Sequence, residues 1–272
     1  MRLIAAASSS LRAVLGRPAQ RAEWLGVTPA ALYLAVAGEP GVLAVLAHDA
    51  VRLPFGLLLA STGAELPLTA LAPSGELAAS PCLVGDGMVT WTGPDGPVIV
   101  RAVREWAPAR AGRGRVAASA LGEARRQLGH GSIAQVDSQA LAELSRAAGR
   151  RATGARAAVR LLGRGPGLTP SGDDVLAGYL VGGHAFGLDV QHVRRAVGDR
   201  AHAATTALSA ALLWHAARGE CVDELAALAG ALTGRGAARS ATRRLLAVGH
   251  TSGAALAAGL VLAAEATLRE AA

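Results

Sequence analysis

Hydrophobic positions follow two different periods along the chain. Between about residues 27 and 106, short apolar runs are separated by turn residues, and Gly-Asp-Gly at 85–87 and Pro-Asp-Gly at 94–96 are typical of tight turns. The second of these turns lies between MVTW and VIVRAV, which predicts a β-hairpin. We therefore expect a mostly β domain over residues 1–110.

From about residue 117 the period changes to three and four residues, which is typical of helices. Ala and Leu recur at this spacing in segments whose expected ends carry glycine, namely Gly149, Gly163, Gly219 and Gly249. The boundary is expected in the Pro-, Gly- and Arg-rich stretch 107–119, and a helical domain over 117–272. The predicted fold class is α+β, with a mostly β N-terminal domain followed by an Ala-rich α-helical domain.

The charge of the chain does not indicate a nucleic-acid partner. The net charge is +7, but all 27 basic residues are Arg, they are spread without a basic block, and only 3% of residues are aromatic. Cys82 and Cys221 are too few for a disulfide framework and lack the spacing of a zinc site. Serines at 8–10 interrupt the apolar start, and no charge-free apolar run reaches about 18 residues, so we expect no signal peptide, no membrane span and a cytoplasmic protein.

The stretch GRGPGLTPSGDDVLAG, residues 163–178, concentrates the residues that could carry chemistry. Residues 163–174 are predicted to form a loop that leads onto a helix start, with Ser171 as the N-cap residue and Asp174 in the position of the capping-box acid. A cap explains neither the glycines at 163, 165 and 167 nor the adjacent carboxylates of Asp173 and Asp174. Backbone N–H groups and the helix dipole at such a start suit a phosphate or carboxylate ligand.

The two carboxylates would repel an anion that they faced directly, and two arrangements resolve this conflict. A divalent cation such as Mg²⁺ at Asp173 and Asp174 could bridge to the anion, or the carboxylates could accept hydrogen bonds from a neutral amide or ureido part of the ligand. The residues leave both open. The loop lacks the Gly-Lys-Ser/Thr ending of a P-loop and follows a helix rather than a strand, so a nucleotide site is not expected.

A shorter copy of this motif lies near the C-terminus. TPSGDDVLAG (169–178) aligns with HTSGAALAAG (250–259), which matches the two Ser-Gly pairs and the glycines seven residues after each serine. We predict two similar helix starts that face each other across one site. In the second copy, Ala254 and Ala255 replace the two acids.

The segment TTALSAALLWHAARGE, residues 205–220, separates the two copies. Helical spacing places Thr205 and Ser209 on one face with Thr206 beside them, although these hydroxyls could equally bond back to their own helix. The four-residue spacing of Gly178 and Gly182 predicts a close helix contact. His250, which precedes the second Ser-Gly pair, is the one histidine kept as a site candidate, since no two histidines have convincing metal-ligand spacing.

These three stretches resemble the AllH-type family, long described as a domain of unknown function, whose best-understood member is a subunit of oxamate carbamoyltransferase. The resemblance covers roughly residues 160–260. It implies conversion of oxalurate and phosphate to oxamate and carbamoyl phosphate in allantoin nitrogen catabolism, together with two larger partner subunits, one of them FdrA-like. Relatives typically carry Asp at the position of Ala255, so the resemblance also implies that one contact is lost here.

Motif by motif, the resemblance and the residue types assign roles as follows. Asp173 and Asp174 are the catalytic candidates, and no metal ligand or cofactor is assigned, apart from the divalent cation that these two acids leave open. The candidates for binding the small anionic substrate or phosphate are Gly165, Gly167, Thr169, Ser171, Thr205, Thr206, Ser209, His250, Thr251 and Ser252. Two alternatives remain: a non-catalytic subunit that binds a small anion or regulates a partner, and an independent metal-dependent enzyme that uses the two acids.

Overall fold

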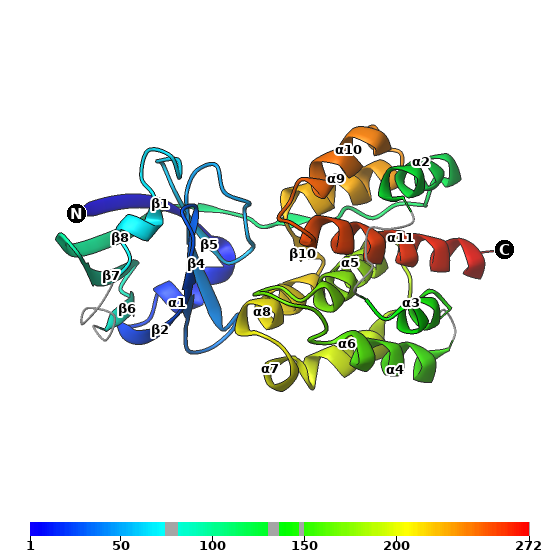
Figure 1. The fold of residues 1–272 in the computed structure, drawn as a ribbon, viewed down its shortest axis with the longest axis horizontal. Coiled ribbons are helices and arrows are strands. Elements are labelled where there is room, and N and C mark those ends of the chain that lie inside the picture. The colour runs from blue at the N-terminus through cyan, green and yellow to red at the C-terminus, as the bar shows by residue number, and fades with distance from the viewer. Residues whose placement is uncertain (74–80, 130–135, 147–149, 272) are drawn as a thin grey trace. The chain divides into compact units, whose positions relative to one another are not determined.

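The computed structural model describes residues 1–73, 81–129, 136–146 and 150–271, and the chain divides into two compact units, Met1–Pro108 and Ala109–Ala272 (Figure 1). The first unit is built mostly of strands and the second mostly of helices. The predicted α+β class, with β structure followed by an Ala-rich helical region, is confirmed.

The strands of the first unit close into a barrel in the order β1-β5-β4-β3-β2-β6-β7-β8. β1 pairs with β8 and β4 with β5 in parallel, whereas the other neighbours are antiparallel. The bounds of the strands are β1 Arg2–Ser8, β2 Gln20–Val27, β3 Ala31–Ala35, β4 Val42–Leu46, β5 Gly56–Leu59, β6 Cys82–Gly85, β7 Met88–Gly93 and β8 Gly96–Trp106. Closure leaves no unpaired edge strand around the barrel.

The apolar runs read from the sequence form the core of this barrel. Leu34, Leu43 and Val100 are fully buried, and the Trp91 indole N–H donates a 2.7 Å hydrogen bond to the carbonyl oxygen of Leu71. The predicted hairpin is confirmed, because β7 pairs with β8 and places Trp91 opposite Val98. A short helix, α1 Arg12–Leu15, follows β1.

The described residues of the second unit form the helices α2 to α11 and one two-stranded sheet. The sheet pairs β9 Ala109–Arg110 with β10 Glu220–Cys221. The bounds of the helices are α2 Ala118–Leu128, α3 Ser138–Ser145, α4 Arg151–Leu161, α5 Ser171–Phe186, α6 Gln191–Gly198, α7 Ala201–Ala204, α8 Ala207–Ala216, α9 Asp223–Leu232, α10 Ala238–Leu246 and α11 Ser252–Glu270.

Helices α5 and α11 lie side by side at the centre of this unit (Figure 1). Every residue of α5 except His184 is buried, which is why this helix is apolar all round rather than on one face. α11 is long and apolar enough to cross a membrane by length and composition alone. Its packing against α5 gives its apolar residues a role within the unit, where Leu260, Ala263 and Ala264 are fully buried.

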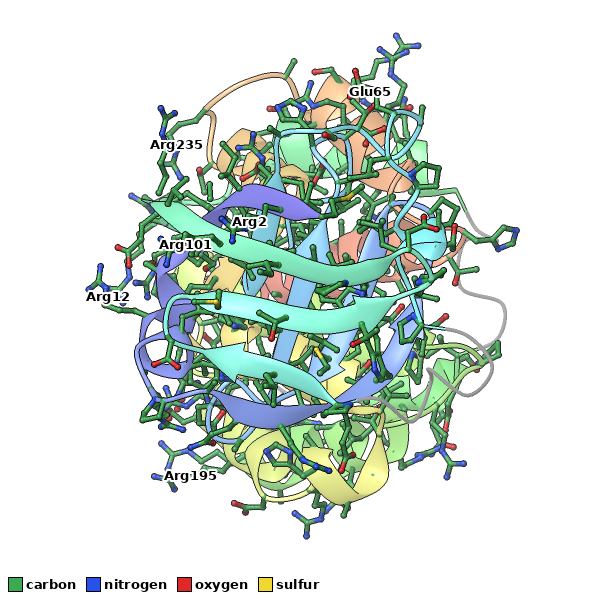
Figure 2. The ribbon with its side chains drawn as sticks, turned by 90° about the vertical axis from the view of Figure 1, so that its left-hand side faces the viewer. Arg2, Arg12, Glu65, Arg101, Arg195 and Arg235 are labelled. Atoms are coloured by element: carbon green, nitrogen blue, oxygen red, sulfur yellow. The ribbon has the colours of Figure 1, made fainter. Side chains whose placement is uncertain are left out.

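Several of the glycines expected at helix ends adopt positive φ. Gly163, Gly219 and Gly249 have φ of 71°, 77° and 59° and follow the ends of α4, α8 and α10, as predicted. Gly149 lies outside the described residues. Arginine side chains project outward from both units, among them Arg12 and Arg195 (Figure 2).

Candidate functional site

The loop between α4 and α5 turns on glycines that no other residue could replace without strain. Gly163 has φ 71°, and a Cβ there would overlap the carbonyl oxygen of Ala204. Gly165 has φ 124°, and a Cβ there would lie 2.8 Å from the backbone nitrogen of Ser171. Gly167 has φ 89° and faces open space. The loop therefore folds back onto the first turn of α5 and leaves its tip accessible.

The prediction that Ser171 caps α5 is wrong. The helix begins at Ser171, so Pro170 holds the N-cap position, and the Pro170 carbonyl accepts hydrogen bonds from the backbone N–H groups of Asp173 and Asp174. No described side chain forms a capping hydrogen bond at this end. The helix starts inside the predicted loop segment 163–174, directly after Pro170. Ser171 is instead buried, with 6% of its surface exposed.

Asp173 links three segments of the chain through hydrogen bonds. Its Oδ1 accepts a 2.7 Å hydrogen bond from the backbone N–H of Gly163, and its Oδ2 accepts one from the Thr205 hydroxyl. Burial raises the pKa of Asp173, and these two hydrogen bonds oppose that rise. Because both oxygens have protein donors, Asp173 is suited to holding the loop, α5 and the residue before α8 in place.

Asp174 differs from its neighbour in the hydrogen bonding of its oxygens. The residue is 3% exposed, and among the described residues its buried Oδ2 has no hydrogen-bond partner. Burial raises the pKa of Asp174 to about 8; the nearby Ser252 hydroxyl lowers it and the charge of Asp173 raises it further. A buried carboxyl group that is largely protonated near pH 7 can donate a proton or a hydrogen bond to a bound molecule.

The start of α8 supplies hydroxyl groups to the same place. Thr206 caps α8, since its Oγ1 accepts a 3.0 Å hydrogen bond from Ser209 N–H and donates a 2.6 Å hydrogen bond to the Leu168 carbonyl in the loop. Ser209 Oγ is buried close to Asp173 but makes no hydrogen bond of standard geometry. The prediction that Thr205 shares a helical face with Ser209 is wrong, because Thr205 lies in extended backbone before α8. Its hydroxyl nevertheless donates a hydrogen bond to Asp173.

The start of α11 meets the start of α5. Ser252, the first residue of α11, shares a 2.9 Å hydrogen bond between its hydroxyl and that of Thr169. The pair of facing helix starts that the repeated motif predicts is therefore present. Thr251 precedes α11 without a capping side-chain bond, and both it and His250 are exposed. These two residues lie at the rim, whereas Asp173, Asp174 and Ser209 lie inside.

Close packing of α5 on α11 depends on glycine. A Cβ at Gly178 would overlap the carbonyl oxygen of Leu256, and one at Gly182 would lie 2.5 Å from the Cβ of Ala263. The contact predicted for these two glycines is confirmed. In the other direction, a Cβ at Gly259 would overlap the carbonyl oxygen of Val175, a reciprocal contact that sequence reasoning missed. The signal was present in the seven-residue spacing from serine to glycine in both copies of the motif.

A second polar pair, of one buried and one half-buried residue, also escaped sequence reasoning. His215 is fully buried, and its Nδ1 lies 2.7 Å from Glu220 Oε2, which lowers the pKa of Glu220. No spacing rule marks these two residues, because the turn after α8 brings them together. Burial raises the pKa of the Cys221 thiol to about 12, so it is not a nucleophile at neutral pH.

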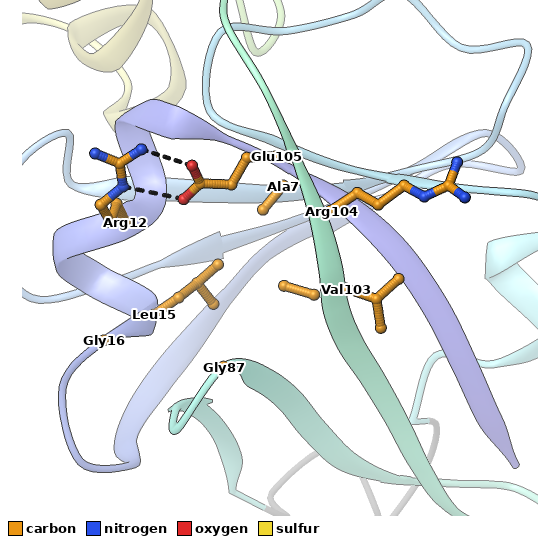
Figure 3. A pocket seen from close by; sticks show the side chains of 9 residues that line it. Ala7, Arg12, Leu15, Gly16, Gly87, Val103, Arg104 and Glu105 are labelled. Atoms are coloured by element: carbon orange, nitrogen blue, oxygen red, sulfur yellow. Dashed lines mark hydrogen bonds and ion pairs between the residues drawn. The ribbon is translucent and has the colours of Figure 1, made fainter.

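A metal centre and a surface pocket are two other kinds of candidate site. Within the described parts of the chain, no group of three or more His, Cys, Asp or Glu side chains could hold a metal ion. A surface pocket of about 400 Å³ lies on the barrel between α1 and β8, where Arg12 forms a two-point contact with Glu105 (Figure 3). None of the candidate residues lines it.

Comparison with known proteins points to the same segment. The family described as oxamate carbamoyltransferase subunit AllH matches residues 161–264, from the last residue of α4 into α11. This range contains every candidate residue at the facing helix starts. No solved structure matches the chain. Residues 161–264 are therefore similar to the AllH-type family, and this match covers less than half of the chain.

Proposed function

We propose that this protein is a subunit of an oxamate carbamoyltransferase that converts oxalurate and phosphate to oxamate and carbamoyl phosphate in allantoin nitrogen catabolism. The observation that carries the proposal is the unpartnered, buried oxygen of Asp174 between two helix starts, inside the segment that the AllH family matches. An FdrA-like subunit and a second large subunit complete the enzyme.

The chemistry needs a proton donor beside two anions. A phosphate oxygen attacks the carbamoyl carbon of oxalurate, a C–O bond forms, the C–N bond breaks, and the departing oxamate nitrogen takes up one proton. Asp174 donates that proton, and the proton carried by HPO₄²⁻ returns to Asp174, so charge and atoms balance. Its raised pKa, about 8, keeps the carboxyl group protonated near neutral pH. Backbone N–H groups and hydroxyls at the two helix starts hold the oxyanions.

Asp173 is a positioning residue in this proposal rather than a group that touches the substrate. Its oxygens accept from Gly163 N–H and Thr205 Oγ–H, which fixes the loop and the start of α8 around Asp174. A divalent cation bound by Asp173 and Asp174 is a separate proposal. To bind Asp173, the cation would have to displace one of these two hydrogen bonds.

The complete enzyme tests the proposal. The purified protein is mixed with the two large subunits, and carbamoyl phosphate formed from oxalurate and phosphate is measured. We expect turnover, and we expect Asp174→Asn to reduce kcat about 100-fold or more, since a positioned acid contributes on that order. Asp199→Asn, which alters an exposed acid at the end of α6, serves as the matched control and should leave turnover unchanged.

One observation favours a second candidate, a non-catalytic subunit that binds a small anion or regulates a partner. The start of α11 has no acidic residue in its first turn, so half of the paired site lacks the carboxylates of the other half. Turnover that survives Asp174→Asn in the complete mixture would support this candidate and place the chemistry on a partner. Absence of turnover in that mixture would overturn the carbamoyltransferase proposal for oxalurate.

A further inference from the structure

The first residues of the helical unit form a strap, residues 109–117, that is bonded along its length to the rest of the unit. The strap begins as β9, which pairs with β10. Farther along, its backbone N–H groups donate hydrogen bonds to three carbonyl oxygens: Ala111 to Gly219 before β10, Gly114 to Ala185 in α5, and Ala117 to Leu232 at the end of α9. The strap is therefore fixed at its ends and in its middle.

Two glycines allow the strap to lie close to the loop after α9. A Cβ at Gly112 would lie 3.0 Å from the guanidinium group of Arg235, and a Cβ at Gly114 would lie 2.8 Å from the Cβ of Thr233. Arg235 in turn donates hydrogen bonds of 2.7 Å and 3.0 Å to the carbonyl oxygens of Gly112 and Arg113. These carbonyls hold the guanidinium group in place but do not neutralise its charge.

Other cations lie beside the strap. The Arg110 guanidinium donates a 2.7 Å hydrogen bond to the Arg218 carbonyl, and the Arg218 guanidinium lies 3.4 Å from the centroid of the Trp214 ring. His184 in α5 has a lowered pKa, because it is partly buried and because the charges of Arg113 and Arg110 are close to it. The strap surface is the face formed by the exposed arginines at 110, 113, 218 and 235 and the half-buried His184.

The carboxylate that contacts this surface is directed inward. Glu220 lies 3.7 Å from Arg110, but it also lies 2.7 Å from the buried His215, and its side chain is only 17% exposed. In the parts of the chain that the structure describes, neither Arg113 nor Arg235 forms an ion pair. The strap surface therefore keeps positive charge that the helical unit does not neutralise.

Exposed arginines occur elsewhere on the chain, but they are not all held in this way. Arg195 of α6 also projects into solvent, and among the described residues its side chain has no hydrogen-bond or ion-pair partner (Figure 2). An arginine that is already held in place loses less conformational freedom when a partner binds. The strap surface thus differs from the general positive charge of the chain because its guanidinium groups are pre-organised.

We propose that the strap surface docks an acidic segment of a partner protein, whose carboxylates contact Arg110, Arg113 and Arg235. Guanidinium groups match carboxylates in charge and in planar shape, and arginines spread along a strap suit a segment with several carboxylates better than one small anion. The Trp214 ring is already covered on one face by Arg218, which disfavours stacking with nucleic-acid bases. The inference goes beyond the proposed reaction and does not depend on it, because it concerns assembly with a partner.

A labelled peptide in which Glu alternates with Gly tests the proposal by fluorescence anisotropy on the full-length chain at low ionic strength. A peptide with Gln in place of Glu is the control. We expect the Glu peptide to bind about tenfold or more tightly than the Gln peptide, and to bind more weakly as salt screens the charges. Neither inorganic phosphate nor a single-stranded oligonucleotide of equal charge should displace the peptide as well as the unlabelled Glu peptide does.

Variants of single arginines locate the binding site. Arg113→Glu reverses a charge whose side chain has no hydrogen-bond partner among the described residues, and it should weaken the Glu peptide about tenfold or more. Arg195→Glu makes the same change on α6, far from Arg235 within the helical unit, and as the matched control should weaken the peptide less than about twofold (Figure 2). Arg113→Lys keeps the charge and should retain most of the binding.

Absence of binding by the Glu peptide at low ionic strength overturns the proposal, as does equal binding of the Glu and Gln peptides. Equal weakening by Arg113→Glu and Arg195→Glu also overturns it, because net charge alone would then attract the peptide. Displacement by phosphate or by the oligonucleotide that matches displacement by the unlabelled peptide would assign the surface to a different ligand and overturn the acidic segment. The comparison of the two peptides uses the unaltered chain, so it does not depend on how any variant folds.

Discussion

Replacing Asp174 with Asn should stabilise the helical unit at pH 8 and leave it unchanged near pH 4. Asn has nearly the same shape as Asp but does not ionise. In the folded protein, burial raises the pKa of Asp174 from 3.8 to about 8, so the folded state binds this proton more tightly than the unfolded chain does. The resulting stability is complete below pH 3.8 and is lost as the pH rises to about 8.

The size of the effect follows from the shift. At about 1.4 kcal/mol for each tenfold change in proton affinity, a rise of the pKa from 3.8 to about 8 gives an upper limit of about 6 kcal/mol. The free energy of unfolding of the unaltered helical unit should therefore fall between pH 4 and pH 8. In Asp174→Asn most of this slope should disappear, and a smaller slope should remain, because burial also raises the pKa of Asp173.

Urea unfolding followed by circular dichroism at 222 nm measures this slope, because the helices lie in the second unit. The tryptophans at 24, 91 and 106 lie in the first unit and give a fluorescence signal dominated by the barrel, which serves as an internal control. A helical unit whose stability does not change between pH 4 and pH 8 would refute the reasoning. So would an Asp174→Asn variant that keeps the full slope of the unaltered protein.

Two further substitutions test the packing and the hydrogen bonds of the site. Gly178→Ala should destabilise the helical unit by about 2–3 kcal/mol in urea unfolding, because its Cβ would overlap the Leu256 carbonyl, whereas Gly122→Ala on α2 has room and should not destabilise it. Equal effects of the two changes would contradict the close contact. Thr205→Val should cost about 1–3 kcal/mol and lower turnover, since it leaves an oxygen of Asp173 without its donor. Thr205→Ser keeps the hydroxyl and should restore both, and a Ser variant as impaired as the Val variant would argue against the hydrogen bond.

Much of the candidate site could be predicted from the sequence because its signals are local. The glycines at 163 and 165 and the adjacent acids stand out in a chain of Ala, Leu, Arg and Val, and positive φ at both glycines explains the loop. The repeated Ser-Gly motif predicted two facing helix starts, which the hydrogen bond from Thr169 to Ser252 joins. The prediction that Ser171 is the N-cap residue was wrong by one position, because the sequence pattern does not distinguish an N-cap serine from a serine one position later.

Other features of the site depend on residues that are distant in the chain. The different environments of Asp173 and Asp174 follow from which donors reach them: Gly163 and Thr205 supply hydrogen bonds to Asp173, whereas no donor in the described parts of the chain reaches Oδ2 of Asp174. The pairing of His215 with Glu220 likewise depends on the turn after α8.

The sequence by itself determined the change from strands to helices, the turn residues and the repeated motif, because backbone preference and hydrophobic period act over a few neighbouring residues. Only the tertiary structure decided that the strands close into a barrel and that Gly178 and Gly259 bring α5 and α11 into reciprocal contact. It also decided that both oxygens of Asp173 accept hydrogen bonds, whereas Oδ2 of the adjacent Asp174 accepts none from the residues that the structure describes. Burial and hydrogen-bond partners are properties of the packed chain, so two neighbouring acids that look alike in the sequence become different chemical groups once it folds.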